Sequence, residues 1–388
     1  MTSAGPPHDH ATAAADGRYD VVVAGAGPAG SAAAIALARA GRTVLLVDAG
    51  RGPAPVGEAL PAAARVLLRD LGADHALTRG HLPCYANRSA WGTDVLASLD
   101  SIRDPHGHGW HLDRPLFDRQ LREHARAQGV RVAARTVARP TGRAGAGHRS
   151  GSTGSGHWTV ELRGPARTAT VRCRWIVDAT GRAAAVATAC GARRLVRDRL
   201  VAVHLTLDPA ESADTTTTVE AAPEGWWYTA PLPAGRRLLA RFTDADLPGA
   251  RHPGFAAALA ATRHIGRLAA RHPPAAGTAL RRAPAHTVRL DTATGDGWTA
   301  VGDAAAAFDP LSSQGILTAL FTGLSGGRAV HAHLAGDAGA LDGYARTLAA
   351  VDTAYRRNHR THYGTEQRWP DQPFWHRRHT TTPEETPV

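Results

Sequence analysis

Residues 19–48 restrict the fold of this chain more than any other segment. An apolar run over 19–24 predicts a strand. After it come an alanine-rich segment, which predicts a helix, and a second apolar run over 43–47, which predicts a strand that ends at Asp48. The turn between the first strand and the helix has the sequence Gly25-Ala26-Gly27-Pro28-Ala29-Gly30. Strand, glycine turn, helix and strand in this order are typical of the βαβ unit that binds a dinucleotide.

Each glycine of this turn has a physical reason. Gly25 allows the tight turn out of the strand, Gly27 has no side chain to hold the backbone away from a pyrophosphate, and Gly30 lets the helix pack closely on the strand. The helix N-terminus directs free amides and its positive dipole end at the phosphates, and Asp48 is placed to accept hydrogen bonds from an adenosine ribose. The predicted cofactor-binding residues of this unit are Gly25, Gly27, Pro28, Ala29, Gly30 and Asp48.

Two later motifs complete an ordered set, and the last of them favours FAD over NAD. The first ends a predicted strand at 178–181, with the sequence Asp-Ala-Thr-Gly, and the second ends another strand at Asp303. Asp303, at the end of the second of these strands, is placed to bind ribityl hydroxyls. The helix that starts near Gly315 can direct its amides at the flavin pyrimidine edge, where negative charge collects on reduction. Ser312 and Ser313 are the expected N-caps of that helix.

A region that alternates between apolar and polar residues lies between these motifs. Its runs over 201–207, 217–221, 226–230 and 237–242 predict an antiparallel sheet with one face in water. The predicted fold class is therefore α/β, with a discontinuous Rossmann-like FAD-binding domain and a second, antiparallel-sheet substrate domain. The expected boundaries are 1–18 for a disordered tail, 19–80, 111–190 and 291–335 for the FAD-binding domain, 81–110 and 191–290 for the substrate domain, and 336–388 for a C-terminal tail with a helix over 338–355.

Charge and composition argue against several classes of protein. The formal net charge is +11, and all 45 basic residues are arginine, because the chain contains no lysine. The arginines are scattered and accompany no recognition motif, so nucleic-acid binding is not expected. No apolar run approaches the length of a membrane span, the first residues are polar, and the three cysteines lie far apart. These features predict a cytoplasmic protein without a membrane segment, a disulfide framework or a zinc site.

Taken together, the motifs resemble the FAD-dependent monooxygenase superfamily built like p-hydroxybenzoate hydroxylase, which has halogenase-like members. The resemblance covers residues 19–375. It implies that Arg114, at the head of an Arg-x-x-Phe-Asp helix, contacts the FAD, and that Ile316 follows Gly315 along the isoalloxazine ring. No second nucleotide-binding motif is visible in the sequence. Reducing equivalents are therefore expected from transient NAD(P)H or from a separate flavin reductase.

One branch of this superfamily is disfavoured by the residues present. The segment 57–61, Gly-Glu-Ala-Leu-Pro, resembles the Gly-Glu element of the flavin-dependent halogenases. Those enzymes use a lysine to carry the activated halogen, and this chain has none. Their Trp-x-Trp-x-Ile-Pro signature is also replaced, here by Trp-Trp-Tyr-Thr-Ala-Pro over 226–231. Halogenation is therefore not the expected reaction.

A closer resemblance is to the flavoproteins that mature amino-acid oxidases carrying cysteine tryptophylquinone. It rests on the segments 107–114 and 308–315 and on the terminal pairs Arg368-Trp369 and Phe374-Trp375. The implied reaction is oxidation or hydroxylation of a tryptophan side chain on a quinoprotein oxidase precursor, so a protein partner is expected. The alternatives are hydroxylation of an aromatic small molecule of secondary metabolism, and a non-catalytic, FAD-bound chaperone of the oxidase.

No single residue of the sequence is decisive for catalysis. His111 and Glu58 are the catalytic candidates. His111 and His108 are interpreted as bases near the flavin, although with 21 histidines most are expected to be surface or structural residues, and Glu58 is interpreted as lying beside the flavin ring. Glu58 is equally compatible with capping the helix that follows it, and Asp309 with positioning the flavin loop or with an ordinary turn. The spacing of His106, His108 and His111 could suggest a metal site, but no carboxylate geometry can be argued near it, so no metal is expected. The expected substrate-cavity residues, which are as compatible with ordinary core, are Trp226, Trp227 and Tyr228.

Overall fold

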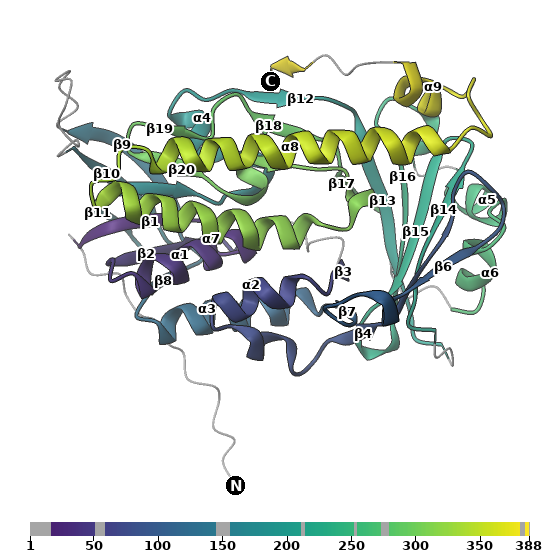
Figure 1. Cartoon of the computed structure of the whole chain (residues 1–388), viewed down its shortest axis with the longest axis horizontal. Coiled ribbons are helices and arrows are strands. Elements are labelled where there is room, and N and C mark those ends of the chain that lie inside the picture. Colours follow the sequence, from purple (N-terminus) through teal and green to yellow (C-terminus); the bar gives the residue numbers. More distant parts are fainter. Residues whose placement is uncertain are drawn as a thin grey trace, which may run out of the picture.

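The computed structural model describes residues 17–50, 59–144, 156–210, 214–251, 254–272, 279–380 and 385–387. It contains two large sheets that lie side by side, the first on the left and the second on the right of Figure 1. The helix α8 (Ala340–Thr365) runs along the molecule from one sheet to the other (Figure 1). This arrangement confirms the predicted α/β class with a Rossmann-like unit and an antiparallel sheet.

The first sheet has the strand order β19-β20-β11-β1-β2-β8. The strand pairs β11–β20, β1–β11, β1–β2 and β2–β8 are all parallel, and the antiparallel strands β10 and β9 extend the sheet beside β11. The bounds are Arg18–Ala24 for β1, Val44–Asp48 for β2, Arg131–Ala134 for β8, Val137–Ala144 for β9, His157–Arg163 for β10, Thr168–Asp178 for β11, Thr294–Gly295 for β19 and Trp298–Ala300 for β20. Strand β1 thus begins at the last residue of the segment predicted as a tail, while residues 1–16 lie outside the described part of the chain.

Strand β1 is apolar on both faces because both faces of the sheet are covered. Val21 and Val23 belong to a core cluster shared with the helices α1 (Pro28–Arg39), α3 (Arg114–Ala127) and α7 (Gly315–Leu334). Val22 belongs to the cluster on the opposite face. Continuous apolar strands are typical of parallel sheets buried in this way.

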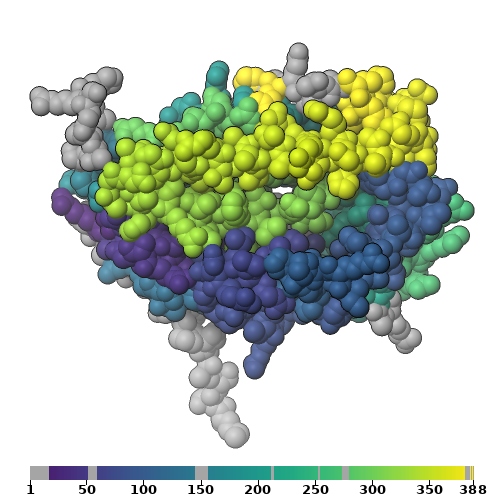
Figure 2. Space-filling view, viewed as in Figure 1, coloured from purple at the N-terminus to yellow at the C-terminus, as the bar shows by residue number. Residues whose placement is uncertain are grey.

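Small residues bring α1 and α7 into close contact. A side chain at Gly323 would overlap the carbonyl oxygen of Ala29, and one at Gly327 would come within 2.8 Å of the carbonyl oxygen of Ala33. In the space-filling view α8 lies directly along α7, which it contacts (Figure 2). The first turn of α1 is thereby held against α7 about two turns after the start of that helix.

The second sheet has the order β17-β13-β16-β15-β14-β5-β6 and confirms the predicted antiparallel sheet, although the pair β5–β14 is parallel. Its four predicted central strands are present, each within two residues of the predicted bounds. The bounds are Ala86–Ala90 for β5, Ala97–Asp100 for β6, Leu200–Leu207 for β13, Thr217–Ala222 for β14, Gly225–Pro231 for β15, Arg237–Asp244 for β16 and Arg281–Pro284 for β17.

The expectation that one face of this sheet is in water is wrong. Every residue of β15 and β16 is buried. One face turns toward the first sheet and the C-terminal helices, and the other is covered by α5 (Phe255–Ala260) and α6 (Ile265–Ala269). The Glu220 carboxylate accepts hydrogen bonds from the amides of Arg263, His264 and Ile265 at the start of α6, so a charged residue of the outer face is satisfied inside the protein.

The C-terminal region is more ordered than the predicted helix and tail. The helix α8 continues ten residues beyond the predicted end at 355, because Tyr363 near its end is fully buried, and α9 (Pro373–Thr380) packs beside it. Two further helices are α2 (Ala64–Asp70) and α4 (Ala185–Ala189). One small sheet consists of β21 (Ala306–Ala307), β18 (Val288–Leu290), β12 (Arg194–Val196) and β22 (Thr386–Pro387). A second small sheet consists of β3 (Ala59–Leu60), β7 (Gly109–His111) and β4 (Leu82–Cys84). Within the described residues, none of the helices combines the length and the apolar character that a membrane crossing requires.

Candidate active site

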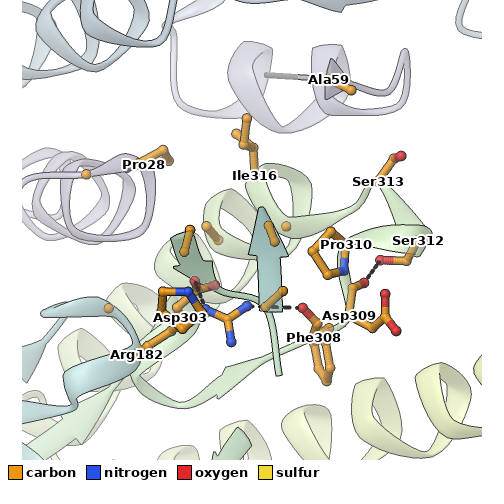
Figure 3. A pocket seen from close by; sticks show the side chains of 18 of the residues that line it. Pro28, Ala59, Arg182, Asp303, Phe308, Asp309, Pro310, Ser312, Ser313 and Ile316 are labelled. Atoms are coloured by element: carbon orange, nitrogen blue, oxygen red, sulfur yellow. Dashed lines mark hydrogen bonds and ion pairs between the residues drawn. The ribbon is translucent and has the colours of Figure 1, made fainter. Parts of the chain in front are cut away.

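A cavity of about 390 Å³ lies between the first sheet, the N-terminus of α7 and the inner face of the second sheet. Figure 3 shows Pro28, Ile316 and Ala59 on one side of it and the loop from Phe308 to Ser313 on another. Seven of the predicted cofactor residues line this cavity, namely Gly27, Pro28, Ala29, Arg114, Asp303, Gly315 and Ile316. The structure therefore brings together residues that are up to 289 positions apart in the sequence.

The glycines of the first turn separate into two kinds. Gly25 has a φ of +105°, and a side chain there would overlap the carbonyl of Ala179, while a side chain at Gly30 would overlap the carbonyl of Gly25. These two glycines are required by the protein's own packing. At Gly27, which lines the cavity, a side chain would meet no protein atom within 4 Å. Gly27 therefore leaves open space at a helix N-terminus, as a bound pyrophosphate requires.

The N-terminus of α7 opens into the same cavity. A side chain at Gly315 would also meet no protein atom within 4 Å. The predicted capping by Ser312 and Ser313 is wrong, because Gln314 occupies the N-cap position and no side chain caps the helix. Ser313 has a φ of +52°, and the hydroxyl of Ser312 donates back to the carbonyl of Asp309. The first amides of α7 thus remain available for a ligand with partial negative charge.

Asp303 lies in the cavity together with a cation that the sequence interpretation missed. Arg182 has its Nε atom 3.9 Å from the Oδ2 atom of Asp303, and it also donates to the carbonyls of His286 and Phe308. Burial raises the pKa of Asp303, and the nearby Arg182 and Arg114 oppose this shift. The available signal was position, since Arg182 directly follows the motif at 178–181.

Asp48 does not line this cavity but lies beside the glycine turn. It ends β2, and its Oδ1 atom accepts a hydrogen bond from the amide of Gly50. Arg122 connects Asp48 to the turn. Its Nη1 atom lies 3.7 Å from the Oδ2 atom of Asp48 and donates to the carbonyl oxygen of Ala26 at 3.3 Å. An elongated dinucleotide that crosses the turn would reach Asp48 with its adenosine end, so the prediction for ribose stays a prediction.

The second sheet supplies an aromatic wall opposite the cofactor residues. Trp226 and Phe242 both line the cavity, and their rings stack with centroids 3.9 Å apart and an interplanar angle of 11°. Tyr228 also lines this cavity, but Trp227 does not. Side chains alternate along a strand, so Trp227 points to the outer face and packs edge-on against Phe255 of α5. The expectation that Trp227 lines the substrate cavity is therefore wrong.

His111 lies outside the cavity that the predicted cofactor residues line. It is fully buried in β7 and does not line the cavity, and its Nε2 atom lies 3.1 Å from the carbonyl oxygen of Thr215. Burial lowers the pKa of His111 to about 4, which keeps the ring neutral. His108 bonds to the carbonyl of Gly109 and packs on Trp110. Glu58 lies outside the described residues, and no group of metal-binding side chains gathers within them.

A parallel sheet with a dinucleotide turn, joined to an antiparallel sheet across an apolar cavity, defines an FAD-dependent oxidoreductase. Residues 81–387 match the tryptophan halogenase family, and residues 23–58 match an NAD(P)-binding Rossmann-like domain. The chain therefore belongs to the tryptophan halogenase family, which confirms the expected superfamily and FAD as the cofactor.

Individual relatives agree with this assignment over nearly the whole chain. The putative FAD-dependent oxidoreductase LodB of Marinomonas mediterranea is 29% identical over 375 residues, which is 93% of this chain and 97% of that protein. The peptidyl tryptophan dihydroxylase QhpG, essential for tryptophylquinone cofactor biogenesis, is 27% identical with a TM-score of 0.74, covering 95% of this chain and 80% of that one. The myxobacterial chondrochloren halogenase CndH has a TM-score of 0.78 at 22% identity, covering 94% of this chain and 87% of that one, and shows the shared fold.

Proposed function

We propose that this flavoprotein oxygenates a tryptophan side chain on a partner protein, the precursor of a quinoprotein oxidase. The observation that carries the proposal is the flat wall formed by the stacked rings of Trp226 and Phe242, which faces the cofactor residues across one cavity. Such a wall fits a planar aromatic substrate, because aromatic rings pack well in offset-stacked or edge-on contact. Bound FAD supplies the redox chemistry, as it accepts electrons and activates dioxygen.

The relatives support the protein nature of the substrate. QhpG acts on peptidyl tryptophan, and its structure covers 95% of this chain at 27% identity. LodB, a putative FAD-dependent oxidoreductase, is similar over 93% of this chain. We infer that the partner presents an exposed tryptophan to the cavity, and that NAD(P)H or a separate flavin reductase supplies the electrons.

Halogenation is the less favoured chemistry for this chain. The halogenase route needs an amine that carries the activated halogen, and the sequence contains no lysine. The cations that line the cavity are Arg114 and Arg182, whose guanidinium groups stay protonated near neutral pH. In this proposal they bind the cofactor and the carboxylate of Asp303, and they do not act as nucleophiles.

The test uses FAD-loaded protein reduced chemically and mixed with oxygenated buffer that contains chloride, bromide and the purified precursor. Mass spectrometry of the precursor should show one or two added oxygen atoms on a tryptophan-containing peptide, with no halogen. A precursor in which that tryptophan is phenylalanine is the matched control. Oxygenation of free indoles but not of the precursor would indicate a small-molecule hydroxylase, and a precursor that stays unmodified although it binds would indicate a chaperone.

A further inference from the structure

Trp226 is connected by hydrogen bonds to the loop that lines the cofactor side of the cavity. Its Nε1 atom donates to the hydroxyl of Tyr363 at 3.0 Å, and this hydroxyl donates to the Oδ2 atom of Asp309 at 2.7 Å. Trp226 belongs to the second sheet, Tyr363 to α8, and Asp309 to the loop that leads into α7. Three separate elements thus meet in one chain of hydrogen bonds beside the cavity.

This chain is shielded from water along its length. The exposed fractions of Trp226, Tyr363 and Asp309 are 1%, 0% and 2%. Burial alone would raise the pKa of Asp309, but hydrogen bonds from His359, Leu311 and Tyr363 outweigh it and hold that pKa below its usual value. An ionised, buried carboxylate makes the Tyr363 bond a charge-assisted one, which is stronger than a bond between neutral groups.

The loop has further anchors on α8, all near the same carboxylate. The Nε2 atom of His359 lies 3.4 Å from the Oδ2 atom of Asp309, and the amide of Asp309 donates to the hydroxyl of Tyr355 at 3.1 Å. Asp309 also accepts from the amide of Leu311 at 2.8 Å through its other oxygen. The loop is therefore anchored to the C-terminal helix at Asp309, and the bond to Leu311 connects this anchor to the next turn of the loop.

We propose that Tyr363 is a positioning residue that ties the substrate-facing Trp226 to the flavin-facing loop 308–315. In this arrangement α8 sets the separation between the wall against which the substrate ring lies and the loop against which the flavin lies. This inference rests on the proposed function for the identity of the substrate, but the coupling itself is a property of the chain and of its cofactor site.

Shape alone does not account for the arrangement. Tyr363 sits among apolar rings, including those of Phe374 and Trp375, and a phenylalanine would fill the same place. The hydroxyl is satisfied only because Trp226 and Asp309 both point at it. Tyr363→Phe therefore removes the coupling and keeps the packing, although it leaves two buried polar groups with one partner fewer.

The helix offers a matched control for this substitution. Tyr344 is also buried on α8, at 3% exposure, and its hydroxyl donates to the backbone carbonyl of Ala300 at 2.9 Å. Tyr344→Phe removes one buried hydrogen bond from the same helix without touching Trp226 or Asp309. Any effect common to both variants is then a general effect of losing a buried hydroxyl.

The first test needs no substrate. FAD-loaded protein is labelled with 5-fluorotryptophan, and the resonance of Trp226 is assigned from its disappearance in Trp226→Phe. Fluorine NMR should show this resonance shifted or broadened in Tyr363→Phe and unchanged in Tyr344→Phe. The visible flavin band should shift in Tyr363→Phe and also in Trp226→Phe, which breaks the chain from its other end. An unmoved Trp226 resonance, or equal shifts in both tyrosine variants, would overturn the proposal.

The second test uses turnover of the precursor. Loss of one buried hydrogen bond corresponds to roughly a three- to tenfold effect, and we expect this fall in kcat with KM within about twofold, because Tyr363 positions groups and does not bind the partner. A rise in KM with unchanged kcat would contradict the positioning role. If no precursor turnover is found in any variant while the NMR shift is present, the proposed function fails and the coupling stands.

Discussion

Trp226 and Trp227 show how adjacent residues in one strand come to have unrelated tasks. Both are fully buried, yet one stacks on Phe242 at the cavity and the other packs on Phe255 beneath α5. The sequence signals for the two are the same, because a period of two cannot be assigned to an inner or outer face when both faces are apolar. The choice of face is determined by α5 and α6, which cover one side of the sheet.

Gly27 and Gly30 are predicted to fail in different ways when replaced. Gly27 has backbone angles open to any residue and free space at its Cβ position, so Gly27→Val should fold with an unchanged melting temperature. The valine would occupy the space next to the helix N-terminus, and we expect FAD affinity to fall by about tenfold or more, which is about 1.4 kcal/mol. Flavin content after gel filtration measures this. Gly30→Val should instead destabilise the fold, and a destabilised Gly27→Val would contradict the distinction.

His111 makes stability depend on pH. Its pKa is lowered from 6.5 to about 4, chiefly by burial. As the pH falls below about 6.5, His111 takes up a proton in the unfolded chain but not in the folded protein. The contribution of His111 to the free energy of unfolding is therefore fully present above about pH 6.5 and is lost as the pH falls toward 4. The loss amounts to about 3 kcal/mol. Urea unfolding across this range should show a shallower pH dependence for His111→Gln than for the wild type, whereas His106→Gln, at an exposed site, should match the wild type.

At the scale of elements, the C-terminal helices are the part that sequence reasoning described least well. The glycine turn, the strand end at Asp178 and the four central strands of the second sheet follow from local patterns, so they were predictable. Asp303 does not end a strand as predicted, because β20 ends at Ala300 and Asp303 lies in the short 3₁₀ turn that follows. Only Tyr344 and Tyr363 of α8 are buried, and no local pattern indicates that Tyr363 pairs with Asp309, which is 54 positions away in the sequence. Its role depends on tertiary contacts that a single sequence does not display.

The attachment of α9 depends on a buried ion pair. Arg378 donates to both carboxylate oxygens of Asp244, and the two side chains are 8% and 3% exposed. Arg378→Met leaves this carboxylate with a weaker set of partners, and we expect a loss of about 3 kcal/mol in the free energy of unfolding. Arg356→Met is the control, because its pair with Asp352 is half exposed and should cost less than about 1 kcal/mol. Chemical denaturation of both variants distinguishes the two cases, and equal losses would contradict the argument.

At the scale of the whole molecule, the cavity is the place where the FAD-binding unit and the second sheet meet. Its walls come from β13, β15 and β16 on one side and from α1, α7 and their preceding turns on the other. The fold class and the cofactor were predictable because the phosphate-binding turn is a local pattern. The environment of the catalytic candidate His111 was not predictable. Burial and hydrogen bonding determine the protonation state of a histidine, and neither can be seen in the sequence.

FAD is therefore expected to stabilise both halves of the molecule. Ligand at a hundredfold excess over its dissociation constant adds about 2.7 kcal/mol to the free energy of unfolding. Hydrogen exchange should show slower exchange in β15 and β16 as well as in β1 and α1 when FAD is added to cofactor-free protein. Protection confined to the first sheet would mean that the second sheet is held independently of the cofactor.

The contact between α1 and α7 also has a consequence for how the protein is made. Helix α1 ends at Arg39 and α7 at Leu334, so the surface that α7 covers has no native partner until roughly 295 more residues have been synthesised. At common translation rates this interval is roughly 15–60 s. During that time the alanine-rich face of α1 is exposed on the ribosome, and the flavin pocket lacks one of its walls. Cofactor capture is thus expected to be a late event in biosynthesis, after α7 has emerged.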